Sequence, residues 1–167
     1  MTRSPISHAP MDSPIGRLWV SVSPGGLLAI SRGEAPEADL PGPAVSDPVA
    51  AASAVAELAA YFAGRLRTFS LALDLDGVGR FDAAVWEAAR WIPFGATASY
   101  GELAAMAGYP RAARAAGGSM SRCRVSPVVP CHRVIHADGS IDGWGTDTWV
   151  KRWLLDHERA ANASSMP

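Results

Sequence analysis

The sequence predicts an α+β fold: a small N-terminal α/β domain with a short antiparallel sheet, packed on an all-α C-terminal domain that contains a helix-turn-helix. Two observations predict it. The first half combines apolar segments of period two with one helical segment, and the second half places apolar residues mainly at helical spacing. Because Asp76-Gly77-Val78-Gly79 separates the halves, we predict domains over residues 1–78 and 79–160 and a flexible tail over 161–167.

The N-terminal half begins with a predicted hairpin. Residues 18–22 and 27–30 are mostly apolar, and Pro24-Gly25-Gly26 between them is a turn sequence. Residues 32–46 are rich in proline, glycine and acidic residues and predict a loop. Residues 69–75 alternate between apolar and polar, which is typical of a half-buried strand.

One helix is predicted between these strands. Asp47 is a favourable N-cap, and Pro48 suits the first helical position because its missing N–H is not needed there. Apolar residues from Val55 to Phe62 then fall on one face, and Gly64 can end the helix. This domain offers no candidate catalytic group, so we expect it to act as a scaffold.

The C-terminal half predicts a series of helices. Residues 81–92 carry apolar side chains on one face, and Pro93-Phe94-Gly95 follows as a break. Ser99 and Glu102 form a capping-box pattern that starts a short helix. After a turn at Gly108-Tyr109-Pro110, residues 111–121 predict another short helix. Two short helices across a glycine-containing turn are typical of a helix-turn-helix.

The last predicted helix begins after Thr146 or Asp147. Its apolar and aromatic side chains share one face and are Val150, Trp153, Leu154 and His157. Beyond residue 160 the sequence predicts the flexible tail.

Charge is distributed unevenly along the 167 residues. The formal net charge is −1, yet residues 90–136 hold six arginines against a single acidic residue, Glu102. A basic stretch inside an acidic chain indicates a surface for phosphate groups, with chance clustering as the alternative. No stretch of eighteen apolar residues exists, so no transmembrane helix is predicted. Two cysteines without a signal-type N-terminus indicate free thiols in a reducing cytoplasm.

The sequence Pro130-Cys131-His132-Arg133-Val134 carries the chemistry. A thiol is a strong nucleophile only as thiolate, and histidine can take its proton near neutral pH. An apolar run over 125–129 precedes it and a turn-rich sequence over 136–140 follows it, which places Cys131 at the start of a loop. A buried cysteine beside an unrelated histidine is the alternative that these neighbours disfavour.

A longer ordered set of segments surrounds this motif. From Phe81 to Glu158 they read FDAAVW, IPFGATASYGELA, RAARAAGGSM, SPVVPCHRVI, ADGSIDG and VKRWLLDHE. The set resembles the O6-alkylguanine-DNA alkyltransferases, a family of suicide repair proteins. The resemblance implies irreversible transfer of the alkyl group from O6-alkylguanine in duplex DNA to Cys131. Each molecule would act once, without a cofactor or a metal.

The resemblance also implies roles for individual residues. The catalytic residues would be Cys131, His132 and Glu158, with the glutamate orienting the histidine. Tyr100 would crowd a phosphate and promote rotation of the damaged nucleotide, and Arg114 would fill the gap left in the duplex. The remaining DNA-binding residues are Ala112, Ala113, Gly117 and Arg122. Small residues on this helix let it approach the minor groove closely without reading bases.

The implied substrate pocket comprises Pro130, Val134, Trp144, Gly145, Thr146, Lys151, Cys123 and Met120. Cys123 stands where the family usually has asparagine, and Trp144 where it has tyrosine. Residues 145–148 replace a glycine-rich loop with bulkier, charged sequence. We therefore expect bulky lesions such as O6-benzylguanine to react more slowly than O6-methylguanine.

Cys123 leaves three interpretations open. It can fill the space of the replaced asparagine, form a disulfide with Cys131 on oxidation, or join Cys131, His132 and His136 in a metal site. The spacing disfavours the metal site, so no metal is expected.

The expected partner is double-stranded DNA carrying O6-alkylguanine, bound through the minor groove independently of sequence, with no membrane partner. We expect a cytoplasmic monomer that joins the nucleoid when bound to DNA, and cooperative binding stays open. Three alternatives remain: action on another lesion or an alkylated small molecule, a non-enzymatic damage-binding module, and a Cys-His hydrolase. Salt-dependent binding to ordinary duplex DNA would favour the repair function.

Overall fold

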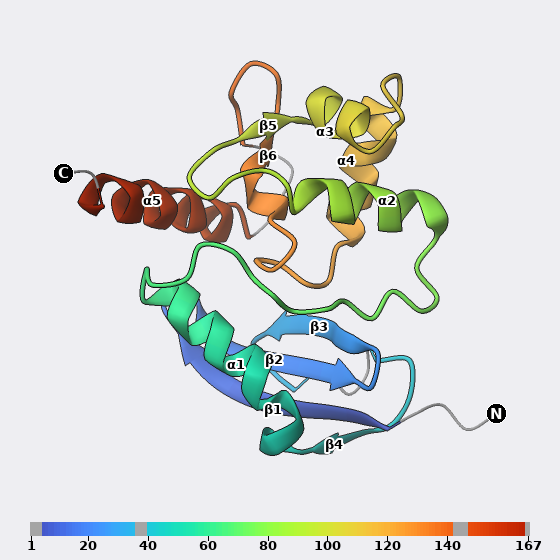
Figure 1. The fold of residues 1–167 in the computed structure, drawn as a ribbon, viewed down its shortest axis with the longest axis vertical. Coiled ribbons are helices and arrows are strands. Elements are labelled where there is room, and N and C mark those ends of the chain that lie inside the picture. The colour runs from blue at the N-terminus through green and yellow to red at the C-terminus, as the bar shows by residue number, and fades with distance from the viewer. Residues whose placement is uncertain (1–4, 36–39, 142–146, 166–167) are drawn as a thin grey trace. The chain divides into compact units, whose positions relative to one another are not determined.

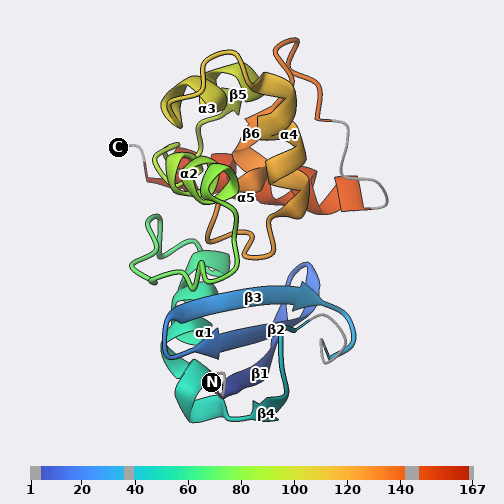
Figure 2. The same cartoon turned by 90° about the vertical axis from the view of Figure 1, so that its right-hand side faces the viewer.

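The α+β fold class is confirmed. The computed structural model describes residues 5–35, 40–141 and 147–165. The chain divides into two compact units, Met1–Gly77 and Val78–Pro167. Figures 1 and 2 show a sheet with one helix in the first unit and mainly helices in the second. No helix of the described residues is long and apolar enough to cross a membrane.

A four-stranded sheet forms the N-terminal unit, in the order β3-β2-β1-β4. The strands are β1 (Ile6–Ser13), β2 (Gly16–Ser23), β3 (Gly26–Arg32) and β4 (Ala44–Ser46). The first three are antiparallel neighbours, whereas β4 pairs with β1 in parallel, so the sheet is mixed and not purely antiparallel as predicted. Helix α1 (Pro48–Phe62) packs against β1 and β2 (Figure 1). As predicted, the Asp47 carboxylate caps it by accepting hydrogen bonds from the amides of residues 49 and 50 at 3.1 Å.

Three strand predictions in this unit need correction. Strand β1 was not predicted, because its inward-facing side chains include polar and small residues, and β4 lies within the segment predicted as a loop. Residues 69–75 form no strand beyond a single bridge between Leu27 and Leu73. The segment nevertheless passes close to the start of β3, because a Cβ added to Gly26 would lie 2.4 Å from the carbonyl oxygen of Ala72. The segment pairs at one point and then leaves the sheet.

The C-terminal unit is mainly helical but is not all-α. Its longer helices are α2 (Arg80–Ala89), α3 (Tyr100–Met106), α4 (Ala113–Arg122) and α5 (Thr148–Ser164). A short 3₁₀ helix, η1 (Cys131–Arg133), leads into β6 (Val134–Ile135), which pairs in parallel with β5 (Ala98–Ser99). Two-residue strands carry no periodicity, so the sequence could not reveal this pair.

The capping box predicted for α3 is confirmed. The Ser99 hydroxyl accepts a hydrogen bond from the Glu102 amide at 3.1 Å, and the Glu102 carboxylate accepts one from the Ser99 amide at 2.7 Å. Helix α4 begins two residues later than predicted, at Ala113, and Arg111 lies in the preceding turn. Helices α3 and α4 pack on one another, which forms the predicted pair of short helices.

Helix α5 differs from the prediction in length and in orientation. It continues to Ser164, into the segment predicted as a tail, where the Asn162 amide donates a hydrogen bond to the Phe94 carbonyl at 3.1 Å. Its buried residues are Val150, Lys151, Leu154, Leu155 and Glu158. Trp153 and His157 instead stack on each other, 4.9 Å apart. The buried face includes two charged residues because both find partners inside the unit, which hydrophobic periodicity does not detect.

Candidate active site

An apolar segment delivers Cys131 to the interior of the C-terminal unit. Val125, Val128, Val129 and Pro130 are buried, and Cys131 is 2% exposed. The Cys131 amide donates to the Val129 carbonyl at 2.8 Å, and the amide of residue 133 donates to the Pro130 carbonyl at 2.9 Å. These bonds close the tight 3₁₀ turn η1. The thiol is therefore held on a rigid backbone rather than on a loose loop.

The imidazole of His132 is bound to Glu158 on α5. Nε2 of His132 lies 2.7 Å from Oε1 of Glu158, and both side chains are completely buried. Because an ionised carboxylate can only accept, Nε2 carries the proton and donates it. In neutral His132 the other ring nitrogen, Nδ1, is then an acceptor, and it has no hydrogen-bond partner among the described residues. The ring therefore presents one free lone pair in the interior.

Arg133 completes this buried cluster. Its Nη2 and Nε donate to the two carboxylate oxygens of Glu158 at 2.8 and 2.9 Å, and its Nη1 donates to the Ile92 carbonyl at 2.7 Å. The amide of Gly95 donates to the same carboxylate at 2.9 Å. Glu158 is thus fixed by three residues from two segments of the unit. Bidentate pairing of this kind sets orientation as well as charge.

Sequence reasoning missed this role for Arg133. It counted Arg133 within the basic stretch expected at a phosphate-binding surface, whereas the side chain is buried. One signal was available: Arg133 lies in a mostly apolar stretch of sequence, and an arginine that is buried is usually paired with an acidic group.

The electrostatics of the cluster favour an ionised Glu158 and a neutral His132. Burial alone would raise the pKa of Glu158, but hydrogen bonds from His132 and Arg133 outweigh it and hold this pKa well below its usual value. Burial lowers the pKa of His132, and the attraction of Glu158 only partly opposes that effect. A neutral imidazole with a free acceptor nitrogen can act as a base.

The thiol of Cys131 is harder to ionise than an exposed one. Burial raises its pKa, and a hydrogen bond with Cys123, at the end of α4, raises it further. The charge of Lys151 acts in the opposite direction. Both cysteines are free thiols. One interpretation of Cys123 was a metal site. Among the described residues, no group of three His, Cys, Asp or Glu side chains could hold a metal ion.

Lys151 and Tyr100 lie near one another, and both interact electrostatically with this thiol. Nζ of Lys151 donates to the Val134 carbonyl at 2.6 Å and lies 5.9 Å from the centre of the Tyr100 ring. Burial lowers the pKa of Lys151 to about 8, partly offset by the charge of Cys131. Burial, and then the charge of Cys131, raise the pKa of Tyr100. The structure therefore brings Lys151, Tyr100 and Cys131 into one electrostatic environment.

The predicted DNA-binding residues follow the surface of α4. Arg114 and Ala113 are exposed, Ala112 is half-buried, and Gly117 faces Tyr100, where a Cβ would lie 3.7 Å from the ring. Arg122 differs from Arg114, because its guanidinium forms a two-pronged ion pair with Asp82 of α2 at 2.7 and 2.9 Å. The hydrogen bond from Arg122 lowers the pKa of Asp82.

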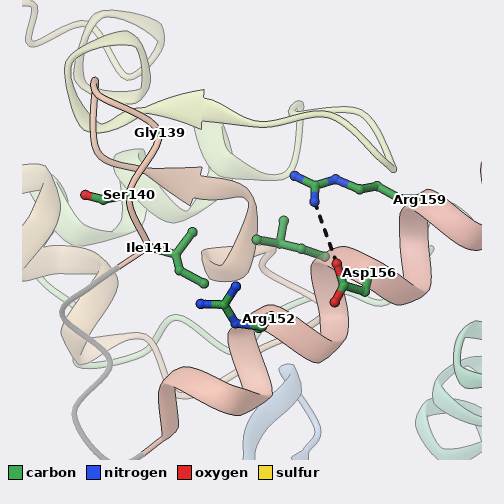
Figure 3. Close-up of a pocket in the computed structure, with 7 residues that line it drawn as sticks. Gly139, Ser140, Ile141, Arg152, Asp156 and Arg159 are labelled. Carbon is green, nitrogen blue, oxygen red and sulfur yellow. Dashed lines mark ion pairs between the residues drawn. The ribbon is translucent and has the colours of Figure 1, made fainter.

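Of the predicted pocket residues, Pro130, Val134, Met120 and Lys151 are buried and Cys123 is half-buried. Trp144, Gly145 and Thr146 lie outside the described residues. A separate cavity of 340 Å³, which the sequence did not predict, is lined by Ser140, Ile141 and the outer side of α5. Figure 3 shows Arg152 pointing toward Ile141 and Arg159 paired with Asp156. This cavity contains neither Cys131 nor His132.

Two family models match this chain. Residues 80–160 match the 6-O-methylguanine DNA methyltransferase, DNA binding domain. Residues 6–75 match the 6-O-methylguanine DNA methyltransferase, ribonuclease-like domain. Together they span both units of the structure.

Similar proteins cover nearly the whole chain. A methylated-DNA–protein-cysteine methyltransferase of Mycolicibacterium paratuberculosis is 39% identical over 161 residues, which is 96% of this chain and 97% of the relative. The protein of that name from Mycobacterium tuberculosis is 40% identical over 93% of each chain. The crystal structure of the M. tuberculosis protein in complex with DNA superposes with a TM-score of 0.81, at 39% identity and 94% coverage of both chains.

Proposed function

The chain belongs to the 6-O-methylguanine DNA methyltransferase family, and from this premise we propose which of its residues perform the repair reaction and how. It is a methylated-DNA–protein-cysteine methyltransferase that binds DNA and acts in DNA repair. The single observation that carries the residue assignment is the buried bond between His132 and Glu158 at 2.7 Å, directly beside the buried Cys131.

Methyl transfer in this site is a displacement at a saturated carbon. Sγ of Cys131 forms a bond to the methyl carbon while the bond from that carbon to O6 of guanine breaks, and the electron pair leaves on the guanine. The thiol proton passes to Nδ1 of His132, directly or through one water, and one proton returns to the guanine, so charge balances. The product thioether is stable, so the reaction consumes the thiol. Each molecule therefore acts once.

His132 is needed because Cys131 is not ionised at rest. Burial and Cys123 raise the pKa of the thiol, so a base must take the proton as the new bond forms. The free Nδ1 of His132 supplies the base, and Glu158 stabilises the imidazolium that results. Arg133 keeps the Glu158 carboxylate aligned, which makes it a positioning residue rather than a catalytic one. The positive charge of Lys151 assists by lowering the pKa of Cys131.

Access to the lesion requires the nucleotide to leave the base stack, because a buried thiol cannot reach O6 inside a duplex. We assign this step to Tyr100 at the start of α3 and to the exposed Arg114 of α4. The small neighbours of Arg114, among them Ala113 and Gly117, leave the helix surface flat enough to approach the minor groove. The small side chains of Ala113 and Gly117 cannot read a base edge, which fits recognition independent of sequence.

Mass spectrometry tests the assignment. Wild-type protein and a Cys131→Ala variant are mixed with duplex DNA containing O6-methylguanine, and the intact protein and its peptides are weighed. We expect one methyl group per wild-type molecule on the Cys131 peptide and none on the variant. Cys123→Ala is the matched control for the second thiol and should still accept the methyl group. Methylation at Cys123, or persistence in Cys131→Ala, would contradict the assignment.

A further inference from the structure

His136 lies beside Tyr100 because of the short parallel strand pair. In β5 and β6, Ala98 pairs with residue 134 and Ser99 with residue 135. The residue that directly follows β5 is Tyr100, and the residue that directly follows β6 is His136. The two rings accordingly meet, with centroids 5.2 Å apart and planes inclined by 59°. Aromatic rings at this separation attract one another beyond simple burial.

The backbone that carries His136 is well fixed. The His136 amide donates to the Ser140 carbonyl at 3.0 Å, and the Gly139 amide donates to the His136 carbonyl at 2.9 Å. The Asp138 carboxylate accepts a further bond from the Ser140 amide at 2.9 Å. The His136 side chain itself is exposed. The backbone of His136 therefore has little freedom, although its ring is exposed.

Two further groups lie near the Tyr100 ring. Gly117 of α4 offers no side chain, and the Lys151 ammonium lies 5.9 Å from the ring centre on the buried side. Among the described residues, His136 is the exposed residue whose ring packs against Tyr100, so it contributes planar packing that Gly117 and Lys151 do not. Without it, the phenol would gain freedom to turn away from the position it has above α4.

We propose that His136 is a positioning residue for nucleotide rotation: its ring packs on Tyr100 and holds the phenol in the orientation that turns the damaged nucleotide out of the duplex. This inference rests on the proposed role of Tyr100. His136 lies outside the Cys131–His132–Glu158 cluster, so it does not take part in the chemical step. Its effect is confined to substrates that must be rotated.

Two substrates separate the rotation step from the chemistry. Single-turnover methylation of Cys131 is measured with duplex DNA containing O6-methylguanine and with the free base O6-methylguanine, which needs no rotation. We expect His136→Ala to react with the duplex about threefold to tenfold more slowly, the range that loss of one aromatic pair gives. The rate with the free base should stay at the wild-type value. Equal slowing with both substrates, or no slowing with the duplex, would overturn the proposal.

His136→Phe distinguishes ring packing from charge. Phenylalanine keeps a planar ring against Tyr100 and cannot carry a proton, so we expect it to restore the duplex rate. A Phe variant as slow as His136→Ala would overturn the packing argument. His157→Ala is the matched control, because His157 also stacks on an aromatic ring but lies on α5 beside Trp153. It should leave both rates unchanged.

The experiment also separates this inference from the function on which it rests. If both substrates methylate Cys131 in the wild-type protein and the rates of His136→Ala are unchanged, only the role of His136 is contradicted. Wild-type protein that leaves Cys131 unmodified by both substrates contradicts the proposed function, and the role of His136 with it. Melting temperatures of the variants are measured alongside, and a fall in His136→Ala would assign its effect to folding.

Discussion

The interior and the rim of the active site are built in different ways. In the interior, His132, Arg133 and Glu158 are buried and joined by hydrogen bonds of 2.7 to 3.2 Å. At the rim, Tyr100 and His136 are held by packing of their rings, and the charged side chain of Arg114 is exposed. A buried charged group that loses its partner destabilises the fold strongly, whereas an exposed group can exchange a lost contact for water at small cost. Changes in the interior should therefore affect folding and chemistry, and changes at the rim should affect DNA.

The largest effect is expected for Glu158→Gln. The substitution removes the negative charge and leaves the guanidinium of Arg133 buried without its counter-ion, which typically costs about 3–5 kcal/mol of unfolding free energy. It also removes the group that stabilises a protonated His132, so methylation of Cys131 should slow. Denaturant unfolding and single-turnover methylation measure the two effects. Asp156→Asn, at an exposed carboxylate on the outer side of α5, is the matched control. Glu102→Gln would not serve, because Glu102 caps helix α3. A stability loss in Asp156→Asn as large as in Glu158→Gln would contradict the comparison.

Acid should weaken the same interior cluster by protonation. Folding lowers the pKa of His132 from 6.5 and that of Glu158 from 4.5. Just below each of these values the unfolded chain therefore binds more protons than the folded chain. The unfolding free energy should consequently fall as pH drops below 6.5, and fall further below 4.5. Denaturant midpoints across this range test it. His132→Gln should remove the first part of the decline, and an undiminished decline in that variant would show that other groups cause it.

A smaller effect is expected for Gly95→Ala, which disturbs the turn that holds Glu158. Gly95 has φ of +81°, and its added Cβ would lie 2.0 Å from the amide nitrogen of Asn162. Gly139→Ala is a matched control, because φ is +85° there and no atom of the residues that the structure describes lies within 4 Å of the added Cβ. We expect the control to cost about 1 kcal/mol from backbone strain and Gly95→Ala to cost more. Equal losses of stability in the two variants, measured by thermal unfolding, would show that the contact with Asn162 is unimportant.

The smallest effect on stability is expected for the two arginines of α4. Arg114→Gln should leave stability unchanged and reduce the slope of log affinity for duplex DNA against log salt by about 1, because it removes one positive charge from the DNA-binding helix. Arg122→Gln should lower the salt slope less, because that guanidinium is bound to Asp82, and should lower stability slightly. Salt titrations of DNA affinity decide between them. A larger change of slope for Arg122→Gln would reverse the assignment of the DNA-contacting arginine.

Local patterns in the sequence determined a large part of the fold. Asp47-Pro48 and the pair Ser99 and Glu102 identify two helix starts, because capping depends only on residues three positions apart or fewer. The ordered segments from Phe81 to Glu158 identified the family, and the Cys131-His132 pair pointed to thiol chemistry. All these features can be read from neighbours along the chain.

The tertiary structure decided what depends on residues distant in sequence. Strand β4 joins β1 across more than thirty residues, and β5 meets β6 to bring Tyr100 against His136. The buried face of α5 contains charges that amphipathic periodicity assigns to solvent. Arg133 belongs to the interior only because Glu158, 25 positions away, meets it there. Capping and turn formation are local interactions written in adjacent residues, whereas the burial of a charge depends on a partner that only folding brings within hydrogen-bonding distance.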